Sequence, residues 1–324
     1  MKALRIDGPG RLALAEVPEP PCPPGECRVA VRLAGICRTD LELAKGYLGF
    51  TGIPGHEFVG TVLQGPENLQ GRRVVGEINV PRDLRRYSQP GYDPRHEPER
   101  TVLGLLGRPG AFAETLTLPP ENLWPVPDSV SDEDAVFTEP LAAALEIFEQ
   151  LHVPPGEKVL VLGDGKLGLL VAQAFARHGC RTFLRGHHDK KMALANRWGV
   201  VPQQEAHAPA DKFPLVVEAT GSPSGFEQAL RWVRPRGTVV LKSTYAPGAA
   251  PALDAAKLVV DEIRLVGSRC GRFAPALRML AQGRFDVRAL IDHRVPFERI
   301  VEGFELAAKP GVLKVLATFQ ATSR

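Results

Sequence analysis

The stretch KVLVLGDGKLG, residues 158–168, decides the fold of this chain. It begins with a mainly apolar run, typical of a strand that is buried on both faces of a parallel sheet. A G-x-G-x-x-G turn follows and opens a helical pattern over residues 167–178. In this context the turn predicts a dinucleotide site, because free N–H groups at the start of a helix bind pyrophosphate. The candidate cofactor-binding residues of the turn are Gly163, Gly165, Lys166, Leu167 and Gly168.

Strand and helix patterns alternate downstream of this turn. Strands are predicted at 182–184, 215–219 and 238–242, and helices at 190–198 and 226–232. Such alternation favours an α/β domain with a doubly wound parallel sheet, the Rossmann fold. We place this domain at residues 141–270.

The remainder of the chain has the pattern of a β-rich domain. Short alternating or apolar runs, separated by Gly and Pro, occur at 28–33, 58–62 and 73–76. After residue 271 the pattern changes again, to one helix followed by short strands. We therefore expect a β-rich domain formed by residues 1–140 and 271–324, with the nucleotide-binding domain inserted into it.

Size and composition exclude several classes of protein. The chain has 324 residues, of which 44% are hydrophobic and 24% charged, as in ordinary globular proteins. No apolar run approaches the ~20 residues that a membrane helix needs, and the N-terminus lacks a signal-peptide pattern, so we expect a cytoplasmic protein without a membrane partner. A net charge of +3, with acidic and basic residues interspersed, argues against nucleic acid as a partner.

The end of the predicted strand 182–184 bears on the choice of cofactor. NAD-binding folds place an acid there to hold the ribose 2′-hydroxyl. Here Gly186 takes that position, with Arg185, His187 and His188 around it. Cationic and imidazole groups suit a 2′-phosphate, which favours NADP. NAD stays the alternative, since Asp189 could bend back toward the ribose.

Metal-ligating residue types occur together near the N-terminus. The segment GICRTD, residues 35–40, precedes GHE, residues 55–57. Thiolate, imidazole and carboxylate are all zinc ligands, and a catalytic zinc has three protein ligands and one open position. A buried cysteine and a hydrogen-bonded core histidine are the alternatives that the residues alone leave open.

The order of four motifs resembles the zinc-dependent medium-chain alcohol dehydrogenase family. These motifs are GICRTDLE, PGHEFVG, TEPLA and GDGKLG, and the likeness is closest to sorbitol, threonine and glucose dehydrogenase-type members. The resemblance implies a GroES-like catalytic domain beside the Rossmann domain, one catalytic zinc, and NADP or NAD as cofactor. The zinc ligands that it implies are Cys37, His56, Glu57 and Glu139.

The resemblance implies further roles by position. Asp40 is similar to the carboxylate that orients the ligand histidine, and Thr39 to the hydroxyl that takes the substrate proton. Arg38 and Lys314 resemble the cations at the pyrophosphate. Other candidate cofactor contacts are Thr220 and Gly221, which resemble the segment beside the nicotinamide ribose.

Two segments depart from the family pattern. Many members bind a structural zinc through four cysteines in the polar segment 79–103, which we expect to be an exposed excursion. Here the corresponding residues are Arg82, Arg85, Ser88 and Glu97, so that site cannot form. We expect Arg82 or Arg85 to pair with Glu97 instead. Glu42 lies where some members have the histidine that ends the proton relay.

We therefore expect an oxidoreductase that transfers hydride between NAD(P) and a small alcohol, polyol or sugar, or the matching carbonyl. A zinc-free quinone or enone reductase of the same fold and a non-enzymatic cofactor-binding protein are the alternatives. The resemblance also implies a homodimer or homotetramer. We place its contact at the predicted edge segment Arg264–Ser268.

Overall fold

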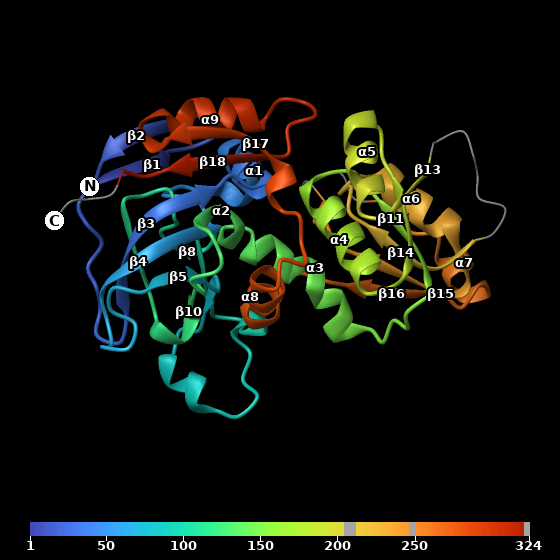
Figure 1. Cartoon of the computed structure of the whole chain (residues 1–324), viewed down its shortest axis with the longest axis horizontal. Helices are drawn as coiled ribbons and strands as arrows, with labels where there is room; N and C mark the ends of the chain where they lie inside the picture. Colours follow the sequence, from blue (N-terminus) through green and yellow to red (C-terminus); the bar gives the residue numbers. More distant parts are fainter. Residues whose placement is uncertain (204–211, 246–250, 321–324) are drawn as a thin grey trace. The chain divides into compact units, whose positions relative to one another are not determined.

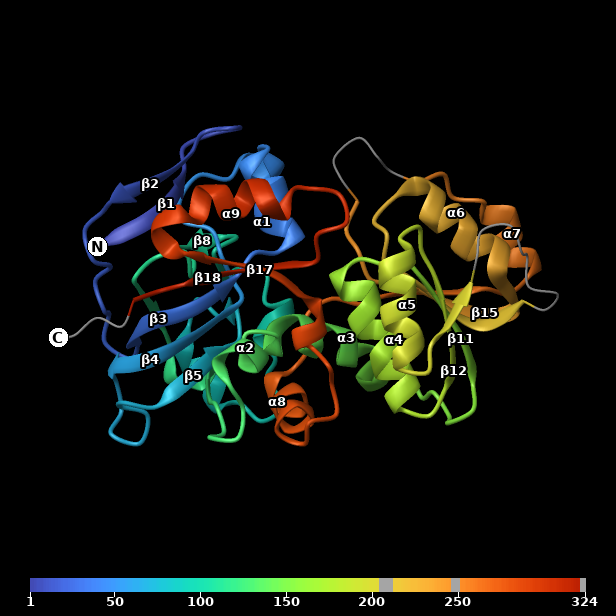
Figure 2. The same cartoon turned by 45° about the horizontal axis from the view of Figure 1, so that its top comes forward.

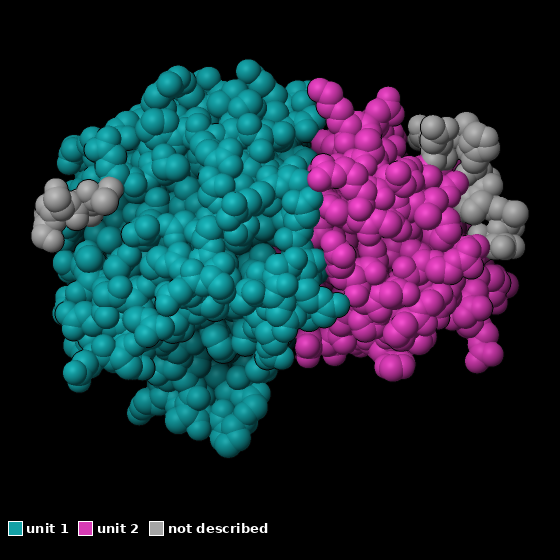
Figure 3. Space-filling view, viewed as in Figure 1, with its two compact units in different colours: residues 1–139, 272–324 teal, residues 140–271 magenta. Residues whose placement is uncertain are grey.

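The structure is a computed structural model that describes residues 1–203, 212–245 and 251–320. The chain forms two compact units, which Figure 3 shows in different colours. Unit 1 contains residues 1–139 and 272–324, and unit 2 contains residues 140–271. Unit 1 is thus assembled from both ends of the chain.

Unit 2 is built on a six-stranded parallel sheet with the order β13-β12-β11-β14-β15-β16. The strands are β11 (Lys158–Leu162), β12 (Arg181–Arg185), β13 (Val201–Gln203), β14 (Phe213–Glu218), β15 (Val233–Leu241) and β16 (Arg264–Gly267). Its helices are α3 (Thr138–Gln150), α4 (Lys166–Arg177), α5 (Asp189–Arg197), α6 (Pro223–Trp232) and α7 (Ala255–Val260). Helices α4 and α5 cover one face of the sheet and α6 the other (Figure 1).

Burial explains the apolar strands of unit 2. Leu160, Val216 and Val239 lie on three neighbouring strands and are at most 1% exposed. Trp232 and Phe226 of α6 pack on them. With helices on both faces, each central strand must be apolar on both sides. This confirms the doubly wound parallel sheet that the alternating pattern predicted.

Unit 1 contains a seven-stranded sheet whose main path is β10-β5-β4-β3-β18-β17, with β9 paired to β3. These strands are β3 (Cys27–Gly35), β4 (Phe58–Gln64), β5 (Arg73–Gly76), β9 (Thr115–Leu118), β10 (Leu123–Pro125), β17 (Ile291–Pro296) and β18 (Lys314–Thr318). Smaller sheets pair β1 (Lys2–Ile6) with β2 (Leu12–Glu16), and β6 (Asn79–Val80) with β7 (Thr101–Leu103) and β8 (Gly107–Arg108). Because β18 pairs with β3, the end of the chain completes the sheet begun near its start.

Several elements of unit 1 were not predicted. Helix α9 (Ile300–Ala307) contacts β17 and β18, where only short strands were expected (Figure 2). Two further helices are α1 (Arg38–Ala44) and α2 (Asp132–Ala135), and α8 (Phe273–Ala281) corresponds to the helix expected after residue 271. Within the described ranges, no helix combines the length and the apolar character that crossing a bilayer requires.

The segment 79–103 is only partly the exposed excursion that we expected. Its ends form β6 and β7, where Val80, Val102 and Leu103 are at most 6% exposed. Two short 3₁₀ helices lie between these strands, at Leu84–Ser88 and Pro94–His96. Arg82, Arg85 and Ser88 are exposed, whereas Arg95 and Glu97 are only 12% and 10% exposed. The apolar residues at the two ends anchor the loop.

Ion pairs hold this loop, although not the pair that we expected. Glu97 accepts a hydrogen bond from Arg86, so the expected partnership with Arg82 or Arg85 is wrong. These two arginines pair elsewhere, Arg85 with Asp83 at 2.9 Å and Arg82 with Glu99 at 3.1 Å. Asp83 is the N-cap of the first 3₁₀ helix and lies only two residues before Arg85. Its carboxylate is therefore close enough to pair with the Arg85 guanidinium.

Candidate active site

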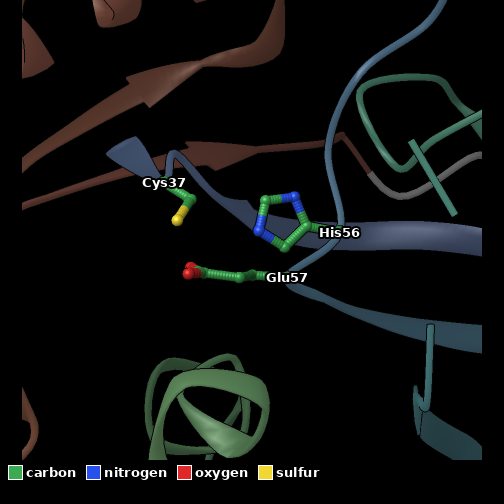
Figure 4. Close-up of side chains that lie close together, drawn as sticks. All are labelled: Cys37, His56 and Glu57. Atoms are coloured by element: carbon green, nitrogen blue, oxygen red, sulfur yellow. The ribbon is translucent and has the colours of Figure 1, made fainter. Parts of the chain in front are cut away.

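Three metal-ligating side chains meet in unit 1. Cys37, His56 and Glu57 each offer a ligand atom, and these atoms all lie within 4.8 Å of one another. Figure 4 shows one ring nitrogen of His56 directed toward the sulfur of Cys37 and the carboxylate of Glu57. His56 and Glu57 are buried, at 4% and 1% exposed, and Cys37 is half-buried.

Strand pairing explains how residues 19 positions apart in sequence come together. Cys37 follows the end of β3, and His56 and Glu57 directly precede β4. The two strands run antiparallel, and Ala34 lies opposite Phe58. The end of β3 therefore lies beside the start of β4, and the loop between them returns the chain to the same edge.

Asp40 joins the two segments that supply the ligands. Its carboxylate is fully buried and accepts hydrogen bonds from the N–H of Cys37 at 2.8 Å and of Gly55 at 3.2 Å. Oδ1 of Asp40 also lies 3.4 Å from Nδ1 of His56. Burial alone lowers the pKa of His56, but the charge of Asp40 outweighs it and raises this pKa well above its ordinary value. Asp40 thus fixes the imidazole that faces the other two ligands.

A buried lysine neutralises Glu57. The Nζ of Lys314, at the start of β18, donates a hydrogen bond to Oε2 of Glu57, and both side chains are 1% exposed. Gly35 makes room for the pair, since a Cβ there would lie 2.5 Å from Oε2 of Glu57. Burial lowers the pKa of Lys314, but Glu57, Cys37 and Glu139 together raise it above its ordinary value. The pyrophosphate contact expected of Lys314 stays a prediction.

The other residues expected at the metal lie around this cluster. Glu139, in the first turn of α3, is outside the three-residue group, but its charge acts on Lys314. Thr39 is half-buried, and its Oγ1 lies 3.8 Å from Sγ of Cys37. Arg38 is exposed and pairs with Glu42 at 2.8 Å.

The donor set fits a catalytic zinc ion. Sulfur, nitrogen and oxygen ligands are those that zinc prefers, and three protein ligands leave the fourth position open for a substrate. Among the described residues no other group of three such side chains converges in this way. The carboxylate of Asp40 lies beside His56, where an outer carboxylate would hold the histidine of a zinc site.

The glycine turn of unit 2 has the conformation that a dinucleotide site requires. Gly163 has a φ of +108°, a backbone conformation that residues other than glycine rarely adopt. A Cβ at Gly168 would lie 1.9 Å from the carbonyl oxygen of Gly163, so this pair packs backbone on backbone. Gly165 caps α4, and Lys166 and Leu167 begin that helix. The first N–H groups of α4 are therefore available to phosphate.

Asp164 organises the residues at the end of β12. Its Oδ2 accepts hydrogen bonds from the N–H groups of His187 and His188, both at 2.8 Å, and lies 2.9 Å from Nδ1 of His188. A Cβ at Gly186 would lie 2.4 Å from Cβ of Asp164. Arg185 lies over the ring of Trp232, with 5.5 Å between the guanidinium carbon and the ring centroid.

A buried acid holds residues 220 and 221, which were also expected to contact the cofactor. Glu218 ends β14, and its Oε1 accepts hydrogen bonds from the N–H groups of Thr220 at 2.6 Å and Gly221 at 3.1 Å. Tyr245 donates to Oε2 at 3.0 Å. Neither Glu218 nor Asp164 was among the residues predicted from the sequence. Asp164 could have been found from the sequence, because it is an acidic residue between two glycines of the turn.

Comparison with known proteins identifies the family. Residues 23–128 match the family model described as "Alcohol dehydrogenase GroES-like domain", and residues 167–282 match "Zinc-binding dehydrogenase". An L-threonine 3-dehydrogenase from Chelativorans sp. (strain BNC1) is 31% identical over 337 residues, which cover 94% of each chain. D-arabinitol dehydrogenase 1 from Uromyces fabae is 26% identical over 345 residues, 97% of this chain and 96% of the relative.

A solved structure agrees with these matches. The alcohol dehydrogenase TADH from Thermus sp. ATN1 superposes with a TM-score of 0.86 at 28% identity, covering 99% of this chain and 100% of that chain. The chain therefore belongs to the zinc-dependent medium-chain alcohol dehydrogenase family. It is an NAD(P)-dependent oxidoreductase that acts on alcohols or polyols, with zinc as its metal. The zinc-free and non-enzymatic alternatives are thereby set aside.

Proposed function

We propose that Cys37, His56 and Glu57 hold one catalytic zinc ion, and that the substrate is a small polyol, sugar or related alcohol, or its carbonyl form. The observation that carries this proposal is the meeting of three different zinc-ligand atoms within 4.8 Å. The match to a zinc-binding dehydrogenase model supports it.

Each residue around the cluster has a separate task in this reaction. When bound, zinc supplies a Lewis acid that lowers the pKa of a coordinated hydroxyl group, and NAD(P) supplies the hydride acceptor. Thr39, beside the sulfur of Cys37, takes the proton that the alcohol loses. Asp40 keeps His56 in the orientation that ligation needs.

The proton leaves Thr39 toward water. Glu42 lies where some members have a relay histidine, but it forms ion pairs with Arg38 at 2.8 Å and Lys45 at 3.2 Å. The Glu42 carboxylate is thus engaged with two cationic side chains. We therefore end the relay at Thr39.

Glu57 is the better candidate for the third ligand. It belongs to the close group, whereas Glu139 does not. The ion pair with Lys314 leaves Glu57 one carboxylate oxygen that makes no hydrogen bond to the described residues. Glu139 then acts on the site through its charge or through water.

The ligand set favours hydroxyl-rich substrates. One thiolate with a carboxylate is a harder donor set than two thiolates, and hard centres bind oxygen more readily. The relatives named for arabinitol and threonine act on substrates with secondary hydroxyl groups. We propose the same class here.

The sheet edge of unit 2 supports a homodimer. Strand β16 is the outermost strand of its sheet, at the segment where we expected the contact. Val259 and Val260 at the end of α7, shortly before β16, are 77% and 79% exposed, which is unusual for valine. An open edge beside exposed apolar side chains suits pairing with a second copy about a two-fold axis.

The test is turnover with and without metal. Protein stripped with a chelator should form no NAD(P)H from polyols, aldoses or threonine, and added zinc should restore the rate. Thr39→Val should lower kcat at least 100-fold with zinc content unchanged, and Thr39→Ser should keep most of the rate. Full turnover in zinc-free protein would refute the proposal.

A further inference from the structure

Asp164 takes the place of the acid that is missing from the end of β12. In folds of this class a carboxylate at the strand end holds the ribose hydroxyl of NAD. Gly186 takes that position here and has no side chain. The carboxyl group of Asp164, which comes from the glycine turn, instead fills the space beside its Cα. A Cβ at Gly186 would lie 2.6 Å from both Cγ and Oδ2 of Asp164.

The hydrogen bonds hold this carboxylate in one orientation. Two backbone N–H groups and the His188 ring converge on Oδ2. Among the residues that the structure describes, none donates a hydrogen bond to Oδ1. Burial raises the pKa of Asp164, but the His188 ring and the two N–H groups outweigh it, so the pKa lies below its ordinary value. The carboxylate is ionised at neutral pH, with one oxygen able to accept from a hydroxyl.

The same contacts remove donors that a 2′-phosphate would need. The N–H groups of His187 and His188 already donate hydrogen bonds to Asp164. The guanidinium of Arg185 lies over Trp232. Lys191 also acts on Asp164, and its charge helps to lower the pKa of that carboxyl group. A phosphate dianion in this place would lie close to the negative charge of Asp164.

We infer that Asp164 is the residue that selects the cofactor, and that it selects NAD over NADP by accepting a ribose hydroxyl and repelling a 2′-phosphate. This inference rests on the proposed cofactor site in unit 2. It reverses the direction expected from Gly186 alone. It also explains Gly186, because any side chain at this position would collide with Asp164.

The test measures binding rather than turnover. Calorimetric titration should give the wild type at least tenfold higher affinity for NADH than for NADPH. Asp164→Asn keeps the shape and the acceptor oxygen but removes the charge. This variant should lose at least tenfold of that preference, mainly through tighter NADPH binding. Glu149→Gln, which neutralises an exposed acid near the end of α3, is the control and should shift the ratio less than twofold.

A reciprocal exchange tests the geometry. Gly186→Asp alone should weaken both cofactors, because it collides with Asp164. Combined with Asp164→Gly, it moves the carboxylate to the strand end and should restore the preference for NADH. If Asp164→Asn does not fold, wild-type binding of ADP-ribose against its 2′-phosphate still decides the question, with at least tenfold tighter binding of ADP-ribose expected.

The outcomes separate this inference from the proposed function. Tighter binding of NADPH by the wild type, or an unchanged ratio in Asp164→Asn, would overturn the inference and leave the dehydrogenase intact. Failure to bind either cofactor at all would overturn the inference together with the cofactor site.

Discussion

The Nζ of Lys314 and Oε2 of Glu57 form an ion pair in which each side chain is only 1% exposed. The two residues are 257 positions apart, and they link the final strand of the sheet to the segment that carries His56. The ring of Phe137 lies 5.4 Å from the ammonium. This ion pair therefore connects β18, near the end of the chain, to the metal cluster and to the core of unit 1.

Removing one partner of this pair should be strongly destabilising. Lys314→Met leaves the Glu57 carboxylate buried without its cation, at a cost of roughly 3–5 kcal/mol. Glu57→Gln should cost a similar amount, because it leaves the lysine uncompensated. The double variant should lose clearly less than the sum of the two. Urea unfolding of all four proteins in metal-free form measures this, and additive losses would show that the pair is not coupled.

Asp132 should make stability depend on pH in the acid range. It pairs with Arg32 at 2.8 Å and Arg73 at 2.7 Å. Burial raises its pKa, but hydrogen bonds from the two arginines outweigh this, and the folded-state pKa lies below the ordinary value. A lowered folded pKa means that the contribution is present above the unfolded pKa of about 3.9 and is lost as the pH falls through the folded value.

Asp132→Asn should therefore lower the free energy of unfolding by about 1 kcal/mol at pH 7. The difference from wild type should begin to shrink near pH 4 and should disappear only once the pH has fallen below the folded-state pKa of Asp132. Asp128→Asn, at an exposed position in the preceding loop, is the control and should change little. Denaturant titrations between pH 2 and pH 8 measure both variants. A difference that stays the same from pH 8 down to pH 2 would mean that Asp132 acts other than through its charge.

The sequence predicted unit 2 better than unit 1 for a physical reason. A strand covered on both faces must be apolar throughout, so β11 and its neighbours are visible as continuous runs. Unit 1 depends on pairing between segments that are distant in sequence, such as β3 with β18. Helix α9 packs against β17 and β18, and the sequence does not show these contacts. The cluster of Cys37, His56 and Glu57 was predicted through the order of motifs that resembles the family, because the chemistry of these residues alone left a buried cysteine and a core histidine as alternatives. The partners Lys314 and Asp164 were not, because a sequence does not show which charges meet.

Cysteine reactivity should follow burial. Cys27 and Cys180 are buried, and burial raises the pKa of each thiol to about 11. At pH 8 only about 0.1% of such a thiol is ionised, compared with roughly a quarter at the ordinary pKa of 8.5. We expect these two cysteines to react at least 100-fold more slowly than Cys22 and Cys270 in native protein. Time-resolved alkylation with peptide mapping measures each rate, and equal rates would contradict the burial.

The proposed assembly has a residue-specific test. The N–H of Ser268 donates to the carbonyl of Leu241 in β15. Because N–H groups alternate in direction along a strand, the N–H of Val266 also points toward β15. The N–H of Leu265 then faces the open edge. Leu265→Pro should dissociate the oligomer without unfolding unit 2, whereas Val266→Pro should damage the sheet itself. Light scattering gives the mass, and a wild-type mass near the 35.1 kDa of one chain would reject the assembly.

Zinc stoichiometry tests the central claim most directly. The cluster of Cys37, His56 and Glu57 provides one site, and none of the four positions aligned with the structural zinc is a cysteine. Elemental analysis of metal-replete protein should find one tightly bound zinc per chain in the wild type and none in Cys37→Ala, whose fold should stay intact by circular dichroism. Two zinc ions per chain, or one zinc retained by Cys37→Ala, would contradict the account.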